Sequence, residues 1–395
     1  MTDETPSRES IRFEDGSFYR FPQRRWSFSN LRELLPVRVV SRGNVAATEL
    51  PRKERPDIDD LEFLPMGGTE AMTWAQSLAA NYTDGILVLQ RGSIVYERYF
   101  GALLATGRHI AFSVTKSFVA TLAATLISEG VLEDTAVVQT YIPELKNSGL
   151  GDATIRNLLD MTTGVRFSEN YADERALFWD FCRSNGFMPR PSDSSGPSTS
   201  HAYLQSLEKE YSHGERFVYK TVNTDALAWV MERVTGSPLS EVLSERIWTR
   251  LGVEQDAFFT VDSMGTEFAG AGLNLCLRDL ARFGEMMRLG GRYNGQQIVP
   301  AFVVDEIRRG GSRELFGPAG YKTLPGWSYR NMWWVSHNAH QAFTARGIHG
   351  QTIYIDPMAE MVIVRFASHP LAANMNLDPT SLPAYEALAS HLLNG

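Results

Sequence analysis

A serine and a lysine three positions apart have the types and spacing that could support nucleophilic chemistry. Ser113 precedes Lys116 in the run AFSVTKSFVA. Three residues are close to one helical turn, so the two side chains would share a face if this run begins a helix. A serine hydroxyl beside an amine is a nucleophile beside a base, provided that burial lowers the pKa of the lysine. The apolar flanks of the run favour such burial.

The same spacing occurs again further along the chain. Ser206 and Lys209 lie in the polar stretch AYLQSLEKEY, which we interpret as a solvated helix where nothing would desolvate the lysine. Residue frequencies alone predict about one such pair in a chain of this length. The spacing is therefore a weak signal, and the apolar surroundings of Ser113 are what distinguish the first pair.

The patterns around Ser113 indicate the elements that would position it. The run is predicted to begin a long buried helix that ends near Gly130, with Ser113 at or just inside its N-terminus. Upstream, two alternating strands surround Arg91-Gly92 as a hairpin. Downstream, helices are predicted over 223–236, with Asn223 or Thr224 as N-cap, and over 238–252. Further helices are expected at 69–80, 153–161, 277–289, 301–309 and 383–395, and strands at 329–336, 350–357 and 359–368.

Strands near both ends of the chain predict that the ends meet in one antiparallel sheet. The polar, proline-punctuated residues 1–60 are expected to form an N-terminal arm packed on a catalytic body of residues 61–395. The body would have an α/β lobe, about 61–110 and 257–395, and a helical lobe, about 111–256. The aromatic-rich insertion 165–215 favours a binding lid or rim over a plain linker.

Composition excludes several classes of function. With 38 basic and 46 acidic residues the net charge is −8, and no basic cluster suits nucleic acid or a membrane surface. No apolar run approaches the length of a membrane span. Two cysteines cannot form a disulfide framework, and the N-terminus MTDETPSRES lacks a signal-peptide pattern, so a cytoplasmic protein is predicted. No phosphate-binding glycine loop is present, and no cofactor is expected.

Several motifs in consistent order resemble the serine β-lactamase and penicillin-binding-protein superfamily, specifically its esterase and class C-like branch. The run SVTK from Ser113 matches the first motif, Tyr219 followed by Thr221 lies where a Tyr-x-Asn motif belongs, and 347–351 precedes a late strand where the third motif lies. The runs FVYKTVNTDALAWVMERVTG, RDLARFGEMM, MWW and GIHGQTIYIDP further resemble the nylon-oligomer hydrolases, which act on the 6-aminohexanoate dimer. The resemblance extends from about residue 24 to the C-terminus.

The resemblance implies a fold and a set of roles. The fold would be α/β (α+β) and β-lactamase-like: an antiparallel sheet flanked by helices, an all-α lobe, and an active site between the lobes. Ser113 would be the acylated nucleophile, Lys116 its general base and Tyr219 the proton shuttle. The amides of Ser113 and Ile348 would form the oxyanion hole. The substrate-binding residues implied are Tyr171, Asp180, Cys182, Thr221, Gly270, Trp334, Gly347 and His349; core packing is an equal alternative for Tyr171 and Trp334, and a structural role for His349.

Two departures from the family pattern bear on the substrate. Ala345-Arg346-Gly347 replaces the usual Lys-Thr-Gly, so strong β-lactamase activity is not expected. On the lid, ungapped counting places Cys182, with Asp180 nearby, where the nylon-oligomer hydrolases have an acidic residue, and Gly270 replaces an asparagine.

We therefore expect a serine hydrolase that forms an acyl-enzyme with small carboxylic esters, and with linear amides such as 6-aminohexanoate oligomers as further substrates. The alternatives are a D,D-peptidase or weak β-lactamase, and a non-catalytic β-lactamase-like binding or assembly protein. No metal is expected: the spacing of His337 and His340 favours a surface loop over a metal site. The oligomeric state stays open, a homodimer included.

Overall fold

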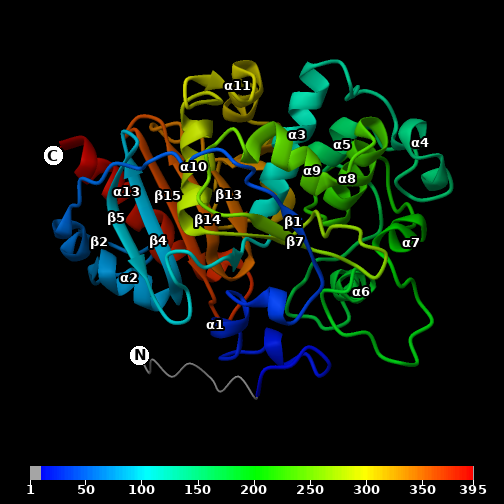
Figure 1. Ribbon diagram of the computed structural model, residues 1–395, viewed down its shortest axis with the longest axis horizontal. Helices are drawn as coiled ribbons and strands as arrows, with labels where there is room; N and C mark the ends of the chain where they lie inside the picture. Colours follow the sequence, from blue (N-terminus) through cyan, green and yellow to red (C-terminus); the bar gives the residue numbers. More distant parts are fainter. Residues whose placement is uncertain (1–9, 395) are drawn as a thin grey trace.

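A seven-stranded antiparallel sheet forms the centre of the α/β lobe in the computed structural model, which describes residues 10–394 (Figure 1). Residues 1–9, which belong to the predicted arm and to the signal-peptide argument, and Gly395 lie outside the described residues. The strand order is β11-β12-β13-β14-β15-β4-β5. The strands are β4 (Thr83–Gln90), β5 (Ser93–Tyr99), β11 (Ser328–Arg330), β12 (Trp333–Val335), β13 (Phe343–Gly347), β14 (Gln351–Asp356) and β15 (Met361–Ala367).

The two ends of the chain meet inside this sheet, as the sequence predicts. Val364 of β15 lies opposite Leu87 of β4, and β4 and β5 form the hairpin around Arg91-Gly92. The strands are buried along almost their whole length, because helices cover both faces. The mixed α/β architecture predicted from the sequence is confirmed.

Alternation along β14 assigns the covering helices to opposite faces of the sheet. A methyl group added at Gly284 of α10 (Leu277–Arg288) would lie 3.0 Å from the Ile353 side chain, so this helix packs closely on that face. The next residue, Tyr354, faces the other side, where its ring lies 5.2 Å from that of Tyr385 in α13 (Asp378–Asn394). Figure 1 shows α10 in front of the sheet.

Helix α3 (Val114–Ser128) contacts α8 (Val222–Thr235) and α9 (Leu239–Leu243). A smaller four-stranded sheet has the strand order β1-β7-β8-β6. Its strands are β1 (Val37–Val40), β6 (His109–Ile110), β7 (Ala257–Thr260) and β8 (Leu273–Leu275). The remaining helices and strands are α1 (Arg24–Ser27), β2 (Glu62–Phe63), β3 (Met72–Thr73), α2 (Trp74–Ala80), α4 (Val138–Tyr141), α5 (Ile155–Leu159), α6 (Leu177–Ser184), α7 (Ser200–Gln205), β9 (Arg292–Tyr293), β10 (Gln296–Gln297), α11 (Ala301–Arg309) and α12 (Arg313–Phe316).

Several predicted helix boundaries are wrong, for local reasons. The helix predicted over 69–80 begins only at Trp74, because Thr73 and Gln76 form a capping box there. The α8 helix begins at Val222 with Thr221 at the N-cap position, so Asn223 lies inside its first turn, where its side chain accepts a hydrogen bond from Thr163 at 2.8 Å. The closing helix begins at Asp378, ahead of the predicted start, with Pro383 inside it.

Between residues 10 and 394, no helix combines the length and the apolar character needed to cross a membrane.

Candidate active site

Ser113 lies at the junction between β6 and α3, at the N-cap position of the helix. Its side chain makes no capping hydrogen bond, so the hydroxyl remains free for another partner. The preceding residue, Phe112, has a φ of 43°, in the left-handed region. This sharp turn joins the strand to the helix and places Ser113 against a pocket, with 8% of its surface exposed.

Lys116 lies one turn into α3 and is fully buried. Its Nζ is 3.0 Å from Ser113 Oγ, and it donates a hydrogen bond to the carbonyl O of Gly270 at 2.7 Å. Burial lowers the pKa of Lys116 to about 8, although the carboxyl groups of Glu169 and Asp225 oppose the shift. The neutral amine, which can accept a proton from serine, is therefore accessible near physiological pH.

Tyr219 completes a three-residue group around the serine hydroxyl. Its side chain interacts with that of Ser113, and its ring centroid lies 5.1 Å from Lys116 Nζ. The ring stacks on Trp334, with centroids 5.7 Å apart and an interplanar angle of 26°. Burial raises the pKa of Tyr219 well above its ordinary value. Tyr219 therefore stays protonated and can pass a proton from one neighbour to another.

The end of β13 approaches the serine turn very closely. A methyl group added at Gly347 would lie 2.7 Å from the carbonyl O of Ala111 and 3.1 Å from the amide N of Ser113. Outside the regular elements of the described chain, neither the Ser113 amide nor the Ile348 amide donates to a backbone carbonyl. Two unpaired amides at the edge of one pocket are the arrangement that stabilises an oxyanion.

The pocket beside Ser113 has a volume of about 290 Å³. It is lined by Ser113, Tyr171, Tyr219, Ala319, Gly320, Tyr321, Thr323, Trp334, Arg346, Ile348, Ala373, Asn374, Met375 and Asp378. The structure therefore brings Tyr171 and Trp334, both implied by the family resemblance, into the same pocket as the serine. It also brings in Tyr321, whose sequence context gave no indication of a site.

Arg346 and Asp378 form a buried ion pair in the pocket wall, which the sequence reasoning missed. Asp378 also accepts a hydrogen bond from Thr323 at 2.5 Å, and the Arg346 guanidinium lies 5.5 Å from the Trp334 ring centroid. The only signal for Arg346 in the sequence was its place in the third motif, directly before Gly347 at the end of β13. No local pattern could have indicated Asp378.

Glu169 is a second residue that the motifs did not reveal. Its side chain accepts a hydrogen bond from Thr221, while its other carboxyl oxygen, Oε2, is buried without a hydrogen-bond partner. Burial raises the pKa of Glu169 to about 7, against the opposing charge of Lys116. Thr221 is 1% exposed and bonds this carboxyl group, and it does not line the pocket.

Gly270 and Cys182 do not line the pocket beside Ser113. A methyl group added at Gly270 would lie 2.3 Å from Thr221 Cγ2, so no side chain fits there, and the residue's contribution is the carbonyl that holds Lys116. Cys182 is a free, buried cysteine, and burial raises the pKa of its thiol well above the ordinary value. A neutral buried thiol cannot replace the acidic lid residue of the nylon-oligomer hydrolases.

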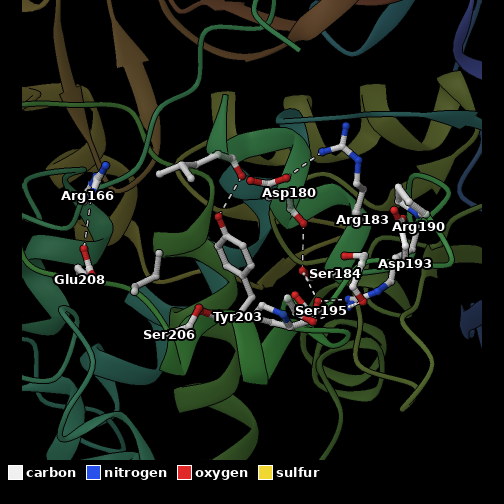
Figure 2. Close-up of a pocket in the computed structure, with 16 residues that line it drawn as sticks. Arg166, Asp180, Arg183, Ser184, Arg190, Asp193, Ser195, Tyr203, Ser206 and Glu208 are labelled. Atoms are coloured by element: carbon white, nitrogen blue, oxygen red, sulfur yellow. Dashed lines mark hydrogen bonds and ion pairs between the residues drawn. The ribbon is translucent and has the colours of Figure 1, made fainter. Parts of the chain in front are cut away.

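Asp180 lies on α6 and faces a different cavity of about 700 Å³ (Figure 2). This cavity is lined by helices α6 and α7 and by the loop that joins them. The carboxylate is exposed and lies 2.9 Å from Arg183. Figure 2 also shows Arg166 paired with Glu208, which are 3.4 Å apart. The charge of Asp180 is therefore already countered, away from Ser113, and we do not include it in the proposed site.

The second serine and lysine pair is not brought together. Helix α7 ends at Gln205, so the predicted polar helix stops before Lys209, and both Ser206 and Lys209 are exposed. Lys209 pairs with Asp152 on the surface. Only the pair at Ser113 combines the spacing with burial.

His349 follows Ile348 and is 1% exposed. Its ring faces the N-terminal arm, where Nε2 lies 2.8 Å from the hydroxyl O of Tyr19. Of the two roles left open by the sequence, substrate contact and local structure, this placement supports the structural one. His337 and His340 have separate partners, Ser328 and Asp356, and no group of His, Cys, Asp and Glu in the described chain is arranged to hold a metal ion.

The sequence model of the beta-lactamase family matches residues 75–380. The chain belongs to the beta-lactamase family. A 6-aminohexanoate-dimer hydrolase from Paenarthrobacter ureafaciens is 35% identical to it over 355 residues, which cover 90% of this chain and 88% of that protein. The predicted resemblance and the β-lactamase-like fold are thus confirmed, and this chain's relatives are hydrolases.

Solved structures agree with this membership of the beta-lactamase family. A protein from Bacillus anthracis, provisionally assigned as a 6-aminohexanoate-dimer hydrolase, matches with a TM-score of 0.90 at 31% identity over 99% of each chain. EstCE1, a hydrolase with promiscuous acyltransferase activity, matches with a TM-score of 0.60 at 17% identity over 80% of this chain and 99% of that one. At 17% identity the likeness shows the fold alone.

Proposed function

We propose that this protein is a serine hydrolase that forms an acyl-enzyme on Ser113 with small carboxylic esters and with linear amides of the 6-aminohexanoate type. The observation that carries the proposal is the 3.0 Å contact between Lys116 Nζ and Ser113 Oγ in a buried setting where the lysine pKa is lowered. The relative named 6-aminohexanoate-dimer hydrolase supports the amide part of the proposal.

The geometry supports a two-step reaction. Neutral Lys116 takes the proton of Ser113 as its Oγ attacks the substrate carbonyl carbon, and the amides of Ser113 and Ile348 bind the developing oxyanion. The C–O or C–N bond of the tetrahedral intermediate then breaks as the proton passes through Tyr219 to the leaving oxygen or nitrogen, which departs as alcohol or amine and leaves the acyl group on Ser113. Water then attacks the acyl-enzyme by the reverse route, releasing the carboxylic acid and restoring the serine.

The pocket supports small substrates. Its volume of about 290 Å³ lies at the lower end of the range for small-molecule sites. Arg346 is the one cation among the described residues that line it, and Asp378 already balances its charge. A β-lactam carboxylate would thus find no free cation, which makes a β-lactamase the weaker candidate.

Labelling and turnover together test the proposal. We expect hydrolysis of p-nitrophenyl acetate and butyrate, release of 6-aminohexanoate from its linear dimer, and a fluorophosphonate adduct that peptide mapping locates on Ser113 and not on Ser206. Faster hydrolysis of nitrocefin than of any ester would favour the β-lactamase instead. Absence of both ester turnover and phosphonylation would indicate a binding or assembly protein.

The rate is expected to rise with pH through the pKa of Lys116. Only the neutral amine accepts the serine proton, and burial lowers this pKa to about 8. Below that pH the neutral fraction falls about tenfold per unit, so kcat/KM should fall in parallel, whereas above it kcat/KM should level off. A profile for p-nitrophenyl butyrate, corrected for spontaneous hydrolysis, measures this. A flat profile, or a rate that declines as pH rises through this range, would contradict the role of Lys116.

Substituting Gly347 by alanine is expected to lower kcat about 100-fold, because displacement of reacting groups by about 1 Å has an effect of this size. The added methyl group would lie 2.7 Å from the carbonyl O of Ala111 and would push β13 away from the serine turn. Gly196→Ala is the matched control, since nothing lies within 4 Å of the methyl group there. Equal kcat values for the two variants would show that the close approach is not needed.

A further inference from the structure

Two aromatic residues of the N-terminal arm, Tyr19 and Phe28, form a cluster with the two residues that flank the unpaired amides. Phe112 immediately precedes Ser113, and His349 immediately follows Ile348. The ring of Phe28 lies 4.9 Å from that of Phe112 and 5.4 Å from that of His349. The ring of Tyr19 lies 5.4 Å from that of His349, and the rings of Phe112 and His349 are 5.5 Å apart. The arm thus contacts the residue next to each of the two amides.

Both flanking residues have a backbone conformation that a non-glycine residue rarely adopts. The φ angle is 43° at Phe112 and 63° at His349, in the left-handed region. Such conformations cost on the order of 1 kcal/mol or more and persist only where surrounding contacts hold them. The Ser113 amide follows Phe112 directly and the Ile348 amide lies one residue before His349, so contacts that hold these two residues also help to hold the two donors in place.

Polar contacts from the arm hold His349 in addition to the ring contacts. The hydroxyl O of Tyr19 lies 2.8 Å from Nε2, and Nδ1 lies 2.8 Å from Arg24 Nη1 and 2.7 Å from the carbonyl O of His369. The same guanidinium donates to the carbonyl O of Pro370 at 3.0 Å and to that of Tyr19. Burial, together with the charge of Arg24, keeps the pKa of His349 well below its usual range. A neutral ring can lie beside the guanidinium without charge repulsion.

We propose that the N-terminal arm positions the oxyanion hole, with Tyr19 and Arg24 fixing His349 and with Phe28 packing on Phe112. This inference rests on the proposed acyl transfer at Ser113. None of the three arm residues lines the substrate pocket, so they are positioning residues and not catalytic ones. The arm therefore acts on the charge that develops in the transition state and leaves binding of the neutral substrate unchanged.

Conservative variants of the full-length protein test this role. Tyr19→Phe keeps the ring and removes only the hydroxyl, and Arg24→Met removes the guanidinium. Tyr141→Phe is the matched control, because this tyrosine accepts a hydrogen bond from the Glu133 amide at 2.9 Å in α4, at the far edge of the helical lobe (Figure 1). For each variant, kcat and KM with p-nitrophenyl butyrate, the rate of phosphonylation of Ser113 and the Tm are measured.

We expect each variant to lower kcat and the phosphonylation rate by the same factor, about tenfold for Tyr19→Phe, which loses one supporting hydrogen bond, and more for Arg24→Met, which loses several. KM should stay within about twofold and the Tm of Tyr19→Phe close to that of Tyr141→Phe. At the turn itself, His349→Asn should retain more activity than His349→Ala, because asparagine tolerates the left-handed region and keeps a polar group.

Three results would overturn the inference. The first is unchanged kcat in Tyr19→Phe. The second is a rise in KM with kcat unchanged, which would make the arm a substrate contact. The third is a loss of kcat that matches the loss of Tm and also occurs in Tyr141→Phe, which would make the role purely structural. Failure of the proposed function is recognised separately, since the unmodified protein would then neither hydrolyse esters nor become labelled at Ser113, and the inference would fall with it.

Discussion

Substituting Ser113 by alanine is expected to abolish covalent labelling and to lower ester turnover by about 10⁴-fold or more, the effect of removing a nucleophile from a catalytic group that acts as a unit. The amides, Lys116 and Tyr219 would remain, so a small residual rate over the uncatalysed reaction should persist. The fold should tolerate the change, because the hydroxyl does not cap α3. Turnover of p-nitrophenyl butyrate, intact-protein mass after fluorophosphonate treatment and Tm measure the three effects.

Ser206→Ala is the internal control for this experiment. Ser206 has the same spacing to a lysine, but both residues are exposed and Lys209 pairs with Asp152. Its substitution should change neither turnover nor labelling. If Ser113→Ala retained turnover while Ser206→Ala lost it, the nucleophile would have been assigned to the wrong pair.

Substituting Lys116 by methionine is expected to lower the acylation rate about 10³-fold or more, because the serine would lose the base that removes its proton. Methionine is close to lysine in length and apolar, so the buried site stays filled. The substitution also removes the hydrogen bond that Lys116 donates to the carbonyl O of Gly270. The rate of phosphonylation at several pH values measures the effect directly.

The pH dependence separates a base from a mere packing residue. In the unmodified protein the rate should rise through the lowered pKa of Lys116, whereas in Lys116→Met this rise should disappear. Lys209→Met, at the exposed pair, should keep both the rate and the profile. A Lys116→Met variant with a nearly normal rate and the same pH profile would show that another group accepts the proton.

Strong local patterns in the sequence predicted the main elements of the fold. The β4 and β5 hairpin alternates around Arg91-Gly92, and α3 is an apolar run that ends near Gly130. Short strands were missed, because β6 and β8 have two and three residues and depend on their neighbours for pairing. The same holds for β1, which lies within the predicted arm and pairs with β7, with Val37 opposite Thr260.

The residues of the candidate site divide in the same way, into those that local motifs indicate and those that only the fold brings together. Ser113, Lys116 and Tyr219 belong to motifs whose order along the chain is recognisable, and the structure brings them together. Asp378 reaches Arg346 only through the folding of α13 against β13, so no spacing in the sequence indicates the pair. The lid residues were the least predictable: ungapped counting placed Cys182 at the acidic position, where the thiol is buried, and the nearby Asp180 lines the other cavity.

The pairing of β15 with β4 determines when, during synthesis, the groups of the candidate site can come together. The neighbours of β4 in the sheet are β5, made directly after it, and β15, made long after it. Contacts between such distant segments form slowly, since a long loop must close before they contribute. A nascent chain on the ribosome therefore carries Ser113 and Lys116 long before it holds the amide of Ile348 beside them. Turnover would begin only after β15 has been made and has entered the sheet.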